Sequence, residues 1–353
     1  MAFLAVEPGT PGTPGIAGRL KLAPVRVGDL LTPALLLEAD AFEHNLATMA
    51  AAVPGSRLRP HMKAHKCTAL AARQVAAGHH NFTCATVREM EGMAAAGLGE
   101  DLLLANEVLD TTRLGRLQAR VTVAVDSAET VTAAARGGVK EVLIDVNVGL
   151  PRCGIPPEQA GELAELARSH GLTVRGVMGY EGHVVGLPER PLREEMASES
   201  MALLLQAHAD VGGEIISAGG TGTYDINTWA NEIQAGSYVL MDTAYNKLGL
   251  PFRQVLSVLA TVISVSSAGY AVANCGLKAL GMDHGNPELE GGGTVMFVSD
   301  EHLSFVPARP VKVGDLVRVI PGHCDPTVAL HERMHLVRDE QVLETWEVDL
   351  RGW

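Results

Sequence analysis

Short apolar strands alternate with helical segments through most of this chain, and this alternation restricts its fold more than any other feature. Eight segments have the composition of strands, and helices or loops separate them. The first five begin at a spacing of roughly 20–24 residues, as βα units do. The expected strands are 57–62, 81–85, 101–105, 121–125, 141–146, 173–180, 214–218 and 232–240.

Eight βα units predict an α/β fold, a (β/α)₈ barrel rather than an open sheet. A doubly wound sheet is the alternative, and it would place a glycine-rich turn after the first strand. Residues 60–66 contain no glycine, which favours the barrel. Ala34–Leu37 is expected to form a further strand. Asp40 and Glu43 then resemble a capping box at the start of a helix that runs to about Val53.

The pattern changes after Pro251. Residues 254–267 alternate valine, leucine and isoleucine with small polar residues, and further strands follow without long helices between them. These strands are expected at 293–298, 303–306, 316–320, 331–337 and 344–350. The sequence therefore predicts two domains, a barrel over residues 32–250 and a mostly β domain formed by residues 1–31 and 251–353.

The composition argues against several classes of function. Acidic residues outnumber basic ones 41 to 28, which argues against a nucleic-acid or anionic-membrane surface. No apolar run approaches the roughly 20 residues of a membrane helix, and the N-terminus lacks the basic region of a secretory signal. Five scattered cysteines fit a reducing cytosol better than a disulfide framework. We expect a globular cytoplasmic protein whose Pro- and Gly-rich residues 7–18 are extended or mobile.

Barrel enzymes place their chemistry at the C-terminal ends of the strands. The first strand runs into Arg59-Pro60-His61-Met62-Lys63-Ala64-His65-Lys66-Cys67, where Lys63 can point into a cleft. Desolvation and neighbouring cations lower the pKa of a lysine and make its amine available for a Schiff base. The alternative for this stretch is a basic turn on the surface.

The ends of the later strands supply glycines, hydroxyls, an arginine and a tyrosine. Glycines let backbone N–H groups approach phosphate oxygens, and hydroxyls add donors, although a glycine-rich loop alone is more often a turn. Arg152 is either a solvated loop residue or a guanidinium that faces a phenolate or carboxylate. Tyr180 either packs at the rim or lines a flat cofactor. A lysine, an arginine and a phosphate cradle around one barrel mouth suggest pyridoxal phosphate.

These motifs resemble those of the barrel-type pyridoxal-phosphate enzymes with the alanine-racemase-like fold. Within that group the chain is similar to the D-threonine aldolases and the related D-serine and 3-hydroxyaspartate enzymes. The resemblance covers about residues 32 to 330. Its motifs are Thr32–Ala34, Arg59–Lys66, Arg152–Gly154, Gly179–His183, Gly219–Thr221 and Pro321–Val328.

The resemblance implies roles for individual residues. Lys63 would be the Schiff-base lysine, and Arg152 and Tyr180 would contact the cofactor ring. Gln234 stands where the racemases carry an arginine against the pyridine nitrogen, which argues against a racemase. The phosphate would contact Gly219, Gly220, Thr221, Gly236 and Ser237, and Ser217 and Tyr238 are further predicted cofactor-binding residues.

His323-Cys324-Asp325 follows the expected strand 316–320. In an extended segment side chains at i and i+2 share a face, so His323 and Asp325 would point the same way. One imidazole and one carboxylate form a sparse site for a divalent cation, with a capped turn as the alternative. The related D-serine dehydratases carry His-x-Cys. An oxygen ligand at Asp325 instead favours Mn²⁺, or Mg²⁺, and an aldolase over a dehydratase.

The resemblance implies a pyridoxal-phosphate- and metal-dependent aldolase acting on D-3-hydroxy amino acids, with D-threonine giving glycine and acetaldehyde. The metal would lower the pKa of the β-hydroxyl. The base would be His61, His183 or a metal-bound hydroxide. A dehydratase of D-serine or 3-hydroxyaspartate, and a cofactor-carrying barrel without turnover, stay open as alternatives. The family also implies a homodimer with active sites between one subunit's barrel and the partner's β domain.

Overall fold

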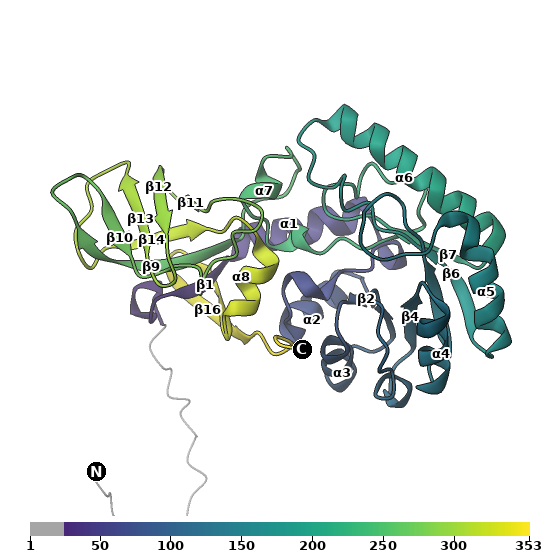
Figure 1. The fold of residues 1–353 in the computed structure, drawn as a ribbon. Helices are drawn as coiled ribbons and strands as arrows, with labels where there is room; N and C mark the ends of the chain where they lie inside the picture. Colours follow the sequence, from purple (N-terminus) through teal and green to yellow (C-terminus); the bar gives the residue numbers. More distant parts are fainter. Residues whose placement is uncertain (1–24) are drawn as a thin grey trace, which may run out of the picture.

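The computed structural model describes residues 25–353 and contains two sheets of different architecture (Figure 1). One is a seven-stranded parallel sheet and the other is a nine-stranded mixed sheet. The predicted extended residues 7–18 lie outside the described part of the chain.

The parallel sheet forms the barrel. Its strands follow one another in chain order, β2 (Asn81–Cys84), β3 (Asp101–Leu104), β4 (Val121–Val125), β5 (Glu141–Asp145), β6 (Thr173–Met178), β7 (Ile215–Ala218) and β8 (Glu232–Ile233). Residues 58–61 lie between its two edges, because Leu58 bridges Ile233 of β8 and His61 bridges Thr83 of β2, both in parallel. This segment takes the place of the predicted first strand, and the α/β barrel is confirmed.

Helices connect most of these strands. They are α2 (Thr68–Ala76), α3 (Val87–Ala95), α4 (Ala128–Arg136), α5 (Ala160–Ser169) and α6 (Arg190–Val211), with short 3-10 turns η2 (Gly55–Arg57), η4 (Leu114–Arg116) and η5 (Pro157–Gln159). Hydroxyl caps start two of them, because Thr86 accepts the N–H of Glu89 and Ser127 accepts that of Thr130. Such caps satisfy N–H groups that a helix leaves free at its start.

The helix α1 (Ala39–Ala52) begins two residues earlier than a cap at Asp40 requires, with Glu38 as its N-cap residue, so the predicted capping box is wrong. Asp40 lies inside the first turn, and its side chain accepts a hydrogen bond of 2.7 Å from Arg338 instead. The negative charge still stabilises the helix, because it lies at the positive end of the helix dipole.

The mixed sheet forms the second domain. Its strands are β1 (Ala34–Glu38), β9 (Leu256–Val265), β10 (Ala271–Ala273), β11 (Glu288–Leu289), β12 (Gly293–Val298), β13 (Leu303–Pro307), β14 (Leu316–Ile320), β15 (Arg333–Arg338) and β16 (Gln341–Glu347). The strand β1 pairs with β9 and β15. It therefore belongs to this domain, although the predicted boundary at residue 32 placed it in the barrel. The remaining short elements are η1 (Val27–Asp29), η3 (Met62–Ala64), η6 (Ser237–Val239), α7 (Thr243–Asn246) and α8 (Cys324–Leu330).

The last barrel strand is much shorter than the predicted 232–240. It ends at Ile233, and the chain enters η6 four residues later. A close backbone contact explains the turn, because a Cβ atom at Gly236 would lie 2.7 Å from the carbonyl oxygen of His61. Glycine lets the chain fold over the barrel mouth at this point.

The barrel interior has an apolar layer and, at the N-terminal strand ends, a charged layer. The apolar layer takes one side chain from each of five strands, namely Leu103, Ala124, Leu143, Met178 and Ile215. In the charged layer, Asp101 lies 3.1 Å from the Nη1 atom of Arg59 and 3.0 Å from the Nη2 atom of Arg175. Burial alone would raise the pKa of Asp101, but Arg59 and Arg175 outweigh it and lower that pKa below 3.8. The buried charges are thus paired.

We expect Asp101→Asn to lower the free energy of unfolding by about 3–5 kcal/mol at pH 7, because two buried guanidinium groups lose their shared anion. Urea unfolding measures the change. The matched control is Glu165→Gln, which removes an exposed pair with Arg168 and should change stability by less than about 1 kcal/mol.

The same carboxyl group gives a pH dependence of known sign. The folded pKa of Asp101 is lower than the unfolded one, so its contribution is complete above the unfolded pKa and is lost as the pH falls. The stability difference between wild type and Asp101→Asn should therefore shrink below about pH 4. Equal stability at pH 7 would show that the pairing contributes nothing net.

Candidate active site

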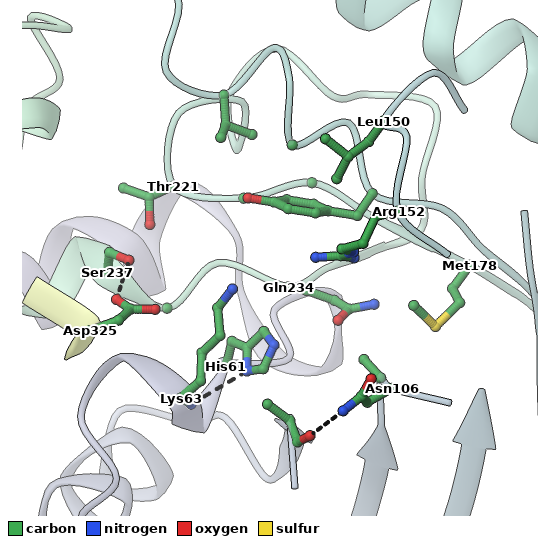
Figure 2. Close-up of a pocket in the computed structure, with 18 of the residues that line it drawn as sticks. His61, Lys63, Asn106, Leu150, Arg152, Met178, Thr221, Gln234, Ser237 and Asp325 are labelled. Carbon is green, nitrogen blue, oxygen red and sulfur yellow. Dashed lines mark hydrogen bonds between the residues drawn. The ribbon is translucent and has the colours of Figure 1, made fainter. Parts of the chain in front are cut away.

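A cavity of about 460 Å³ opens at the C-terminal ends of the barrel strands (Figure 2). Its volume lies within the range of roughly 300–1,000 Å³ that is usual for ligand pockets. The barrel supplies most of the wall, and His284, His323 and Asp325 of the β domain complete it. The predicted barrel residues that line it are His61, Lys63, Arg152, Tyr180, Gly219, Gly220, Thr221, Gln234, Gly236 and Ser237.

Lys63 lies in η3, directly after the segment that closes the barrel. Figure 2 shows its amine pointing into the cavity, and the Nζ atom is 5.7 Å from the centroid of the Tyr180 ring. The guanidinium carbon of Arg152 is 5.4 Å from the same centroid. Burial, with the charges of Glu181 and Asp325, raises the pKa of Tyr180, so the phenol keeps its proton. One aromatic ring thus faces two cations.

The two histidines predicted as bases lie in different places. His61 lines the cavity, and burial together with nearby Lys63 lowers its pKa well below 6.5. Its Nδ1 atom accepts the N–H of Lys63 at 3.4 Å, so the neutral ring carries its proton on Nε2 and acts as a donor. His183 does not line the cavity, and its ring lies against Gly149, where it would be 2.9 Å from an added Cβ atom. In this tautomer the Nε2 atom of His61 is a hydrogen-bond donor. His61 is therefore better suited to binding a ligand acceptor than to acting as a base.

Ser217 and Tyr238 are buried but do not line the cavity. The Ser217 hydroxyl donates to Glu232 at 2.7 Å and accepts the amide of Gln234 at 2.9 Å. Because Ser217 gives its hydrogen to the carboxylate, the NH₂ group of Gln234 must face Ser217, and the Gln234 oxygen has no partner within the part of the chain that the structure describes. Tyr238 is fully buried, and its N–H donates to the Thr221 hydroxyl at 3.0 Å. Both residues support side chains that line the cavity.

One end of the cavity presents unpaired backbone donors. Within residues 25–353, the N–H groups of Thr221, Gly222, Gly236 and Ser237 have no acceptor, although all four residues are buried. A Cβ atom at Gly222 would lie 1.8 Å from the carbonyl oxygen of Val185, so only glycine allows this close approach. Buried N–H groups normally have partners. Thr221, Gly236 and Ser237 line the cavity, and unpaired N–H groups gathered at one end of a cavity are typical of an anion site.

The segment around His323 is not extended as predicted, because α8 begins at Cys324 with His323 as its N-cap residue. The two side chains nevertheless converge, with His323 Nε2 lying 3.9 Å from Asp325 Oδ1. The Nδ1 atom of His323 is 2.9 Å from the carboxylate of Asp283. Such a carboxylate fixes the tautomer and orientation of a metal-binding imidazole. Asp283 therefore leaves Nε2 directed toward Asp325.

Asp283, His284 and His323 also lie close enough together that each could offer one ligand atom to an ion. The rings of His284 and His323 stack, with centroids 3.7 Å apart and planes 13° from parallel. A metal binds an imidazole in the plane of its ring, and two stacked planes do not share such a point. The geometry therefore favours an ion between His323 and Asp325 over one held by both imidazoles.

Several residues of the site could not be predicted from the sequence. Asp283 and His284 stand together in a loop and reach His323 only through the fold. Glu107 and Asn106 line the cavity after β3, a strand end that carries no glycine or cation to mark it. Burial, with the charge and hydrogen bond of Glu107, raises the pKa of Asp145 well above 3.8. Burial and a neighbouring acid thus favour the protonated form of Asp145.

Comparisons with known proteins agree with this architecture. Residues 37–244 match the family model "Alanine racemase, N-terminal domain", and residues 255–337 match "Putative serine dehydratase domain". The described residues contain no helix long and apolar enough to cross a membrane.

Individual proteins match nearly the whole chain. It is 34% identical to a D-threonine aldolase from Arthrobacter sp., over 94% of this chain and 96% of that protein. It is 32% identical to a 3-hydroxy-D-aspartate aldolase from Paracoccus denitrificans (strain Pd 1222), over 92% and 93%. The crystal structure of D-threonine aldolase from Filomicrobium marinum superposes with a TM-score of 0.89 at 32% identity, covering 93% of this chain and 98% of that one.

Proposed function

Because this chain belongs to the D-threonine aldolase family of alanine-racemase-like pyridoxal-phosphate lyases, we propose that it is a metal-dependent aldolase that cleaves D-3-hydroxy amino acids. D-Threonine would give glycine and acetaldehyde. One observation carries the proposal. The amine of Lys63 and the His323–Asp325 pair, which come from different domains, line the same cavity.

The residues at the barrel mouth fit pyridoxal 5′-phosphate. Lys63 would hold the aldehyde carbon, and Tyr180 with Arg152 would contact the ring. The unpaired N–H groups of Thr221 and Ser237 lie among the donors that would hold the phosphate. When bound, the cofactor supplies a ring that accepts electrons from the substrate's Cα atom. The free oxygen of Gln234 is an acceptor, whereas an arginine would be a donor, so the site differs from that of a racemase.

The residues at the β-domain side fit a divalent cation. His323 and Asp325 offer one nitrogen and one oxygen, which leaves positions for water and substrate oxygens. The oxygen of Asp325 favours Mn²⁺ or Mg²⁺ over softer ions. When bound, the cation supplies a positive charge that favours ionisation of the substrate's β-hydroxyl. Asp283 would hold His323 in the tautomer that binds the ion.

The match to a serine dehydratase domain keeps a dehydratase as the second candidate. A dehydratase would break the Cβ–O bond of D-threonine and yield 2-oxobutanoate and ammonia. An aldolase breaks the Cα–Cβ bond instead. Both reactions use the same substrate, so one assay with product analysis separates them.

We expect the wild-type protein, loaded with pyridoxal phosphate and Mn²⁺, to release glycine and acetaldehyde in equal amounts from D-threonine and not from L-threonine. Lys63→Ala should abolish release and the cofactor's lysine-dependent absorbance band, because it removes the cavity amine. Lys247→Ala, which changes an exposed lysine, is the control. Formation of 2-oxobutanoate would instead establish the dehydratase. A band that no D-amino acid perturbs would indicate a carrier without turnover.

The metal site is tested by affinity rather than turnover. After treatment with chelator, calorimetric titration with Mn²⁺ should show binding to wild type and loss of binding in Asp325→Ala. Asp283→Asn should weaken binding by about 10–100-fold, because it removes the partner that orients His323. Asp300→Asn, an exposed change in the same domain, is the control. Mn²⁺ binding that survives Asp325→Ala but not His284→Gln would move the ion to the Asp283–His284–His323 cluster.

We also propose a homodimer. The strand β12 lies at the edge of the mixed sheet and exposes Met296 and Phe297 by 57% and 63%. Exposed apolar edge strands are usually covered, and a second copy of the chain is the partner that the family suggests. Sedimentation velocity should show a dimer for wild type and a monomer for Phe297→Lys. A monomeric wild type would refute the assembly without affecting the cavity.

A further inference from the structure

Glu181 is a fully buried acidic residue that follows Tyr180 but does not line the cavity. All three of its side-chain hydrogen bonds go to the segment after β7. Its Oε2 atom accepts the N–H of Gly219 at 3.1 Å. Its Oε1 atom accepts the hydroxyl of Thr223 at 2.8 Å and the side-chain amide of Asn227 at 3.1 Å. The buried carboxylate of Glu181 therefore binds donors of a single chain segment, residues 219–227.

The direction of each hydrogen bond in this network is fixed. Thr223 accepts the N–H of Gly220 at 3.1 Å, so its own hydrogen is free for Glu181. The oxygen of Asn227 accepts the N–H of Ala230 at 3.1 Å, so its NH₂ group must face Glu181. Both oxygens of Glu181 therefore have to be acceptors. A glutamine there would set its NH₂ group against another donor.

The network determines which donors reach the cavity. The N–H groups of Gly219 and Gly220 are bound to Glu181 and Thr223, and Gly219 has a positive φ of 83° that turns the chain. The next N–H groups, of Thr221 and Gly222, have no acceptor in the described part of the chain. The Thr221 hydroxyl accepts from Tyr238, so its hydrogen is free as well. Thr221 lines the cavity, so this residue presents two free donors, its N–H and its hydroxyl, directly after the two anchored glycines.

We propose that Glu181 is a positioning residue that anchors the loop 219–223 so that its free donors bind the cofactor phosphate. This inference rests on the pyridoxal-phosphate site of the proposed function. The charge of a carboxylate opposes that of a nearby phosphate, so electrostatics alone would favour a neutral residue at position 181. If Glu181 anchors the loop, Glu181→Gln should weaken phosphate binding, because the substitution misdirects the loop as well as removing the charge. Loss of charge repulsion would raise the affinity for the phosphate, whereas loss of the anchor would lower it.

The test compares pyridoxal phosphate with pyridoxal, which lacks the phosphate, by spectroscopic titration of the cofactor-free full-length protein. Wild type should bind pyridoxal phosphate much more tightly. Glu181→Gln should weaken pyridoxal-phosphate binding by about tenfold or more, because donors to the phosphate are lost. Its affinity for pyridoxal should stay within about twofold, since that ligand does not use the loop.

A matched pair of variants keeps the test independent of Glu181. Thr223→Val keeps the shape but removes the hydroxyl between Gly220 and Glu181, and it should reproduce the selective loss. Thr223→Ser retains the hydroxyl and should restore wild-type discrimination. This pair decides the question if Glu181→Gln does not fold, which thermal unfolding without cofactor will show.

The possible results are distinguishable. Equal binding of both ligands by wild type would refute the phosphate site and with it the proposed cofactor. If the folded variants still prefer pyridoxal phosphate over pyridoxal as strongly as wild type does, only the role of Glu181 is refuted. Equal weakening of both ligands would mean a general structural role, and tighter pyridoxal-phosphate binding by Glu181→Gln would mean that charge repulsion dominates. Either result overturns the proposal.

Discussion

The site depends on one buried carboxylate at the junction of the two domains. Asp242 follows the barrel's last turn, and its Oδ1 atom caps α7 by accepting the N–H of Tyr245 at 2.9 Å. Its Oδ2 atom accepts the N–H of Cys324 at 2.9 Å, and Cys324 is the first residue of α8. Two helix starts from different domains thus share one acceptor. This contact places His323 and Asp325 above the barrel mouth.

Three buried acids follow the same physical rule at different levels of the molecule. Asp101 pairs with arginines at the closed end of the barrel, Asp242 joins the domains, and Glu181 anchors a loop beside the cavity. A buried carboxylate is unfavourable unless donors surround it, so each acid requires a defined set of neighbours. That requirement makes them orienting groups, because the donors can satisfy them in only one arrangement. Apolar core side chains pack with fewer directional requirements than these hydrogen-bonded acids.

The barrel and its mouth could be predicted from the sequence because strand ends are marked locally. Lys63 could be placed at the barrel mouth because the sequence predicts a short strand before it, and the carboxyl ends of parallel strands meet at one face. Local patterns failed where tertiary contacts decide. The strand predicted to continue to residue 240 turns at Gly236 because another backbone lies against it. Asp283 contacts a histidine 40 positions away, and no periodicity encodes that pairing.

Ser237 connects the two halves of the cavity. Its hydroxyl donates to Asp325 at 3.2 Å (Figure 2), while its N–H has no acceptor among residues 25–353. The same residue therefore touches the carboxylate that would hold the ion and the backbone that would hold the phosphate.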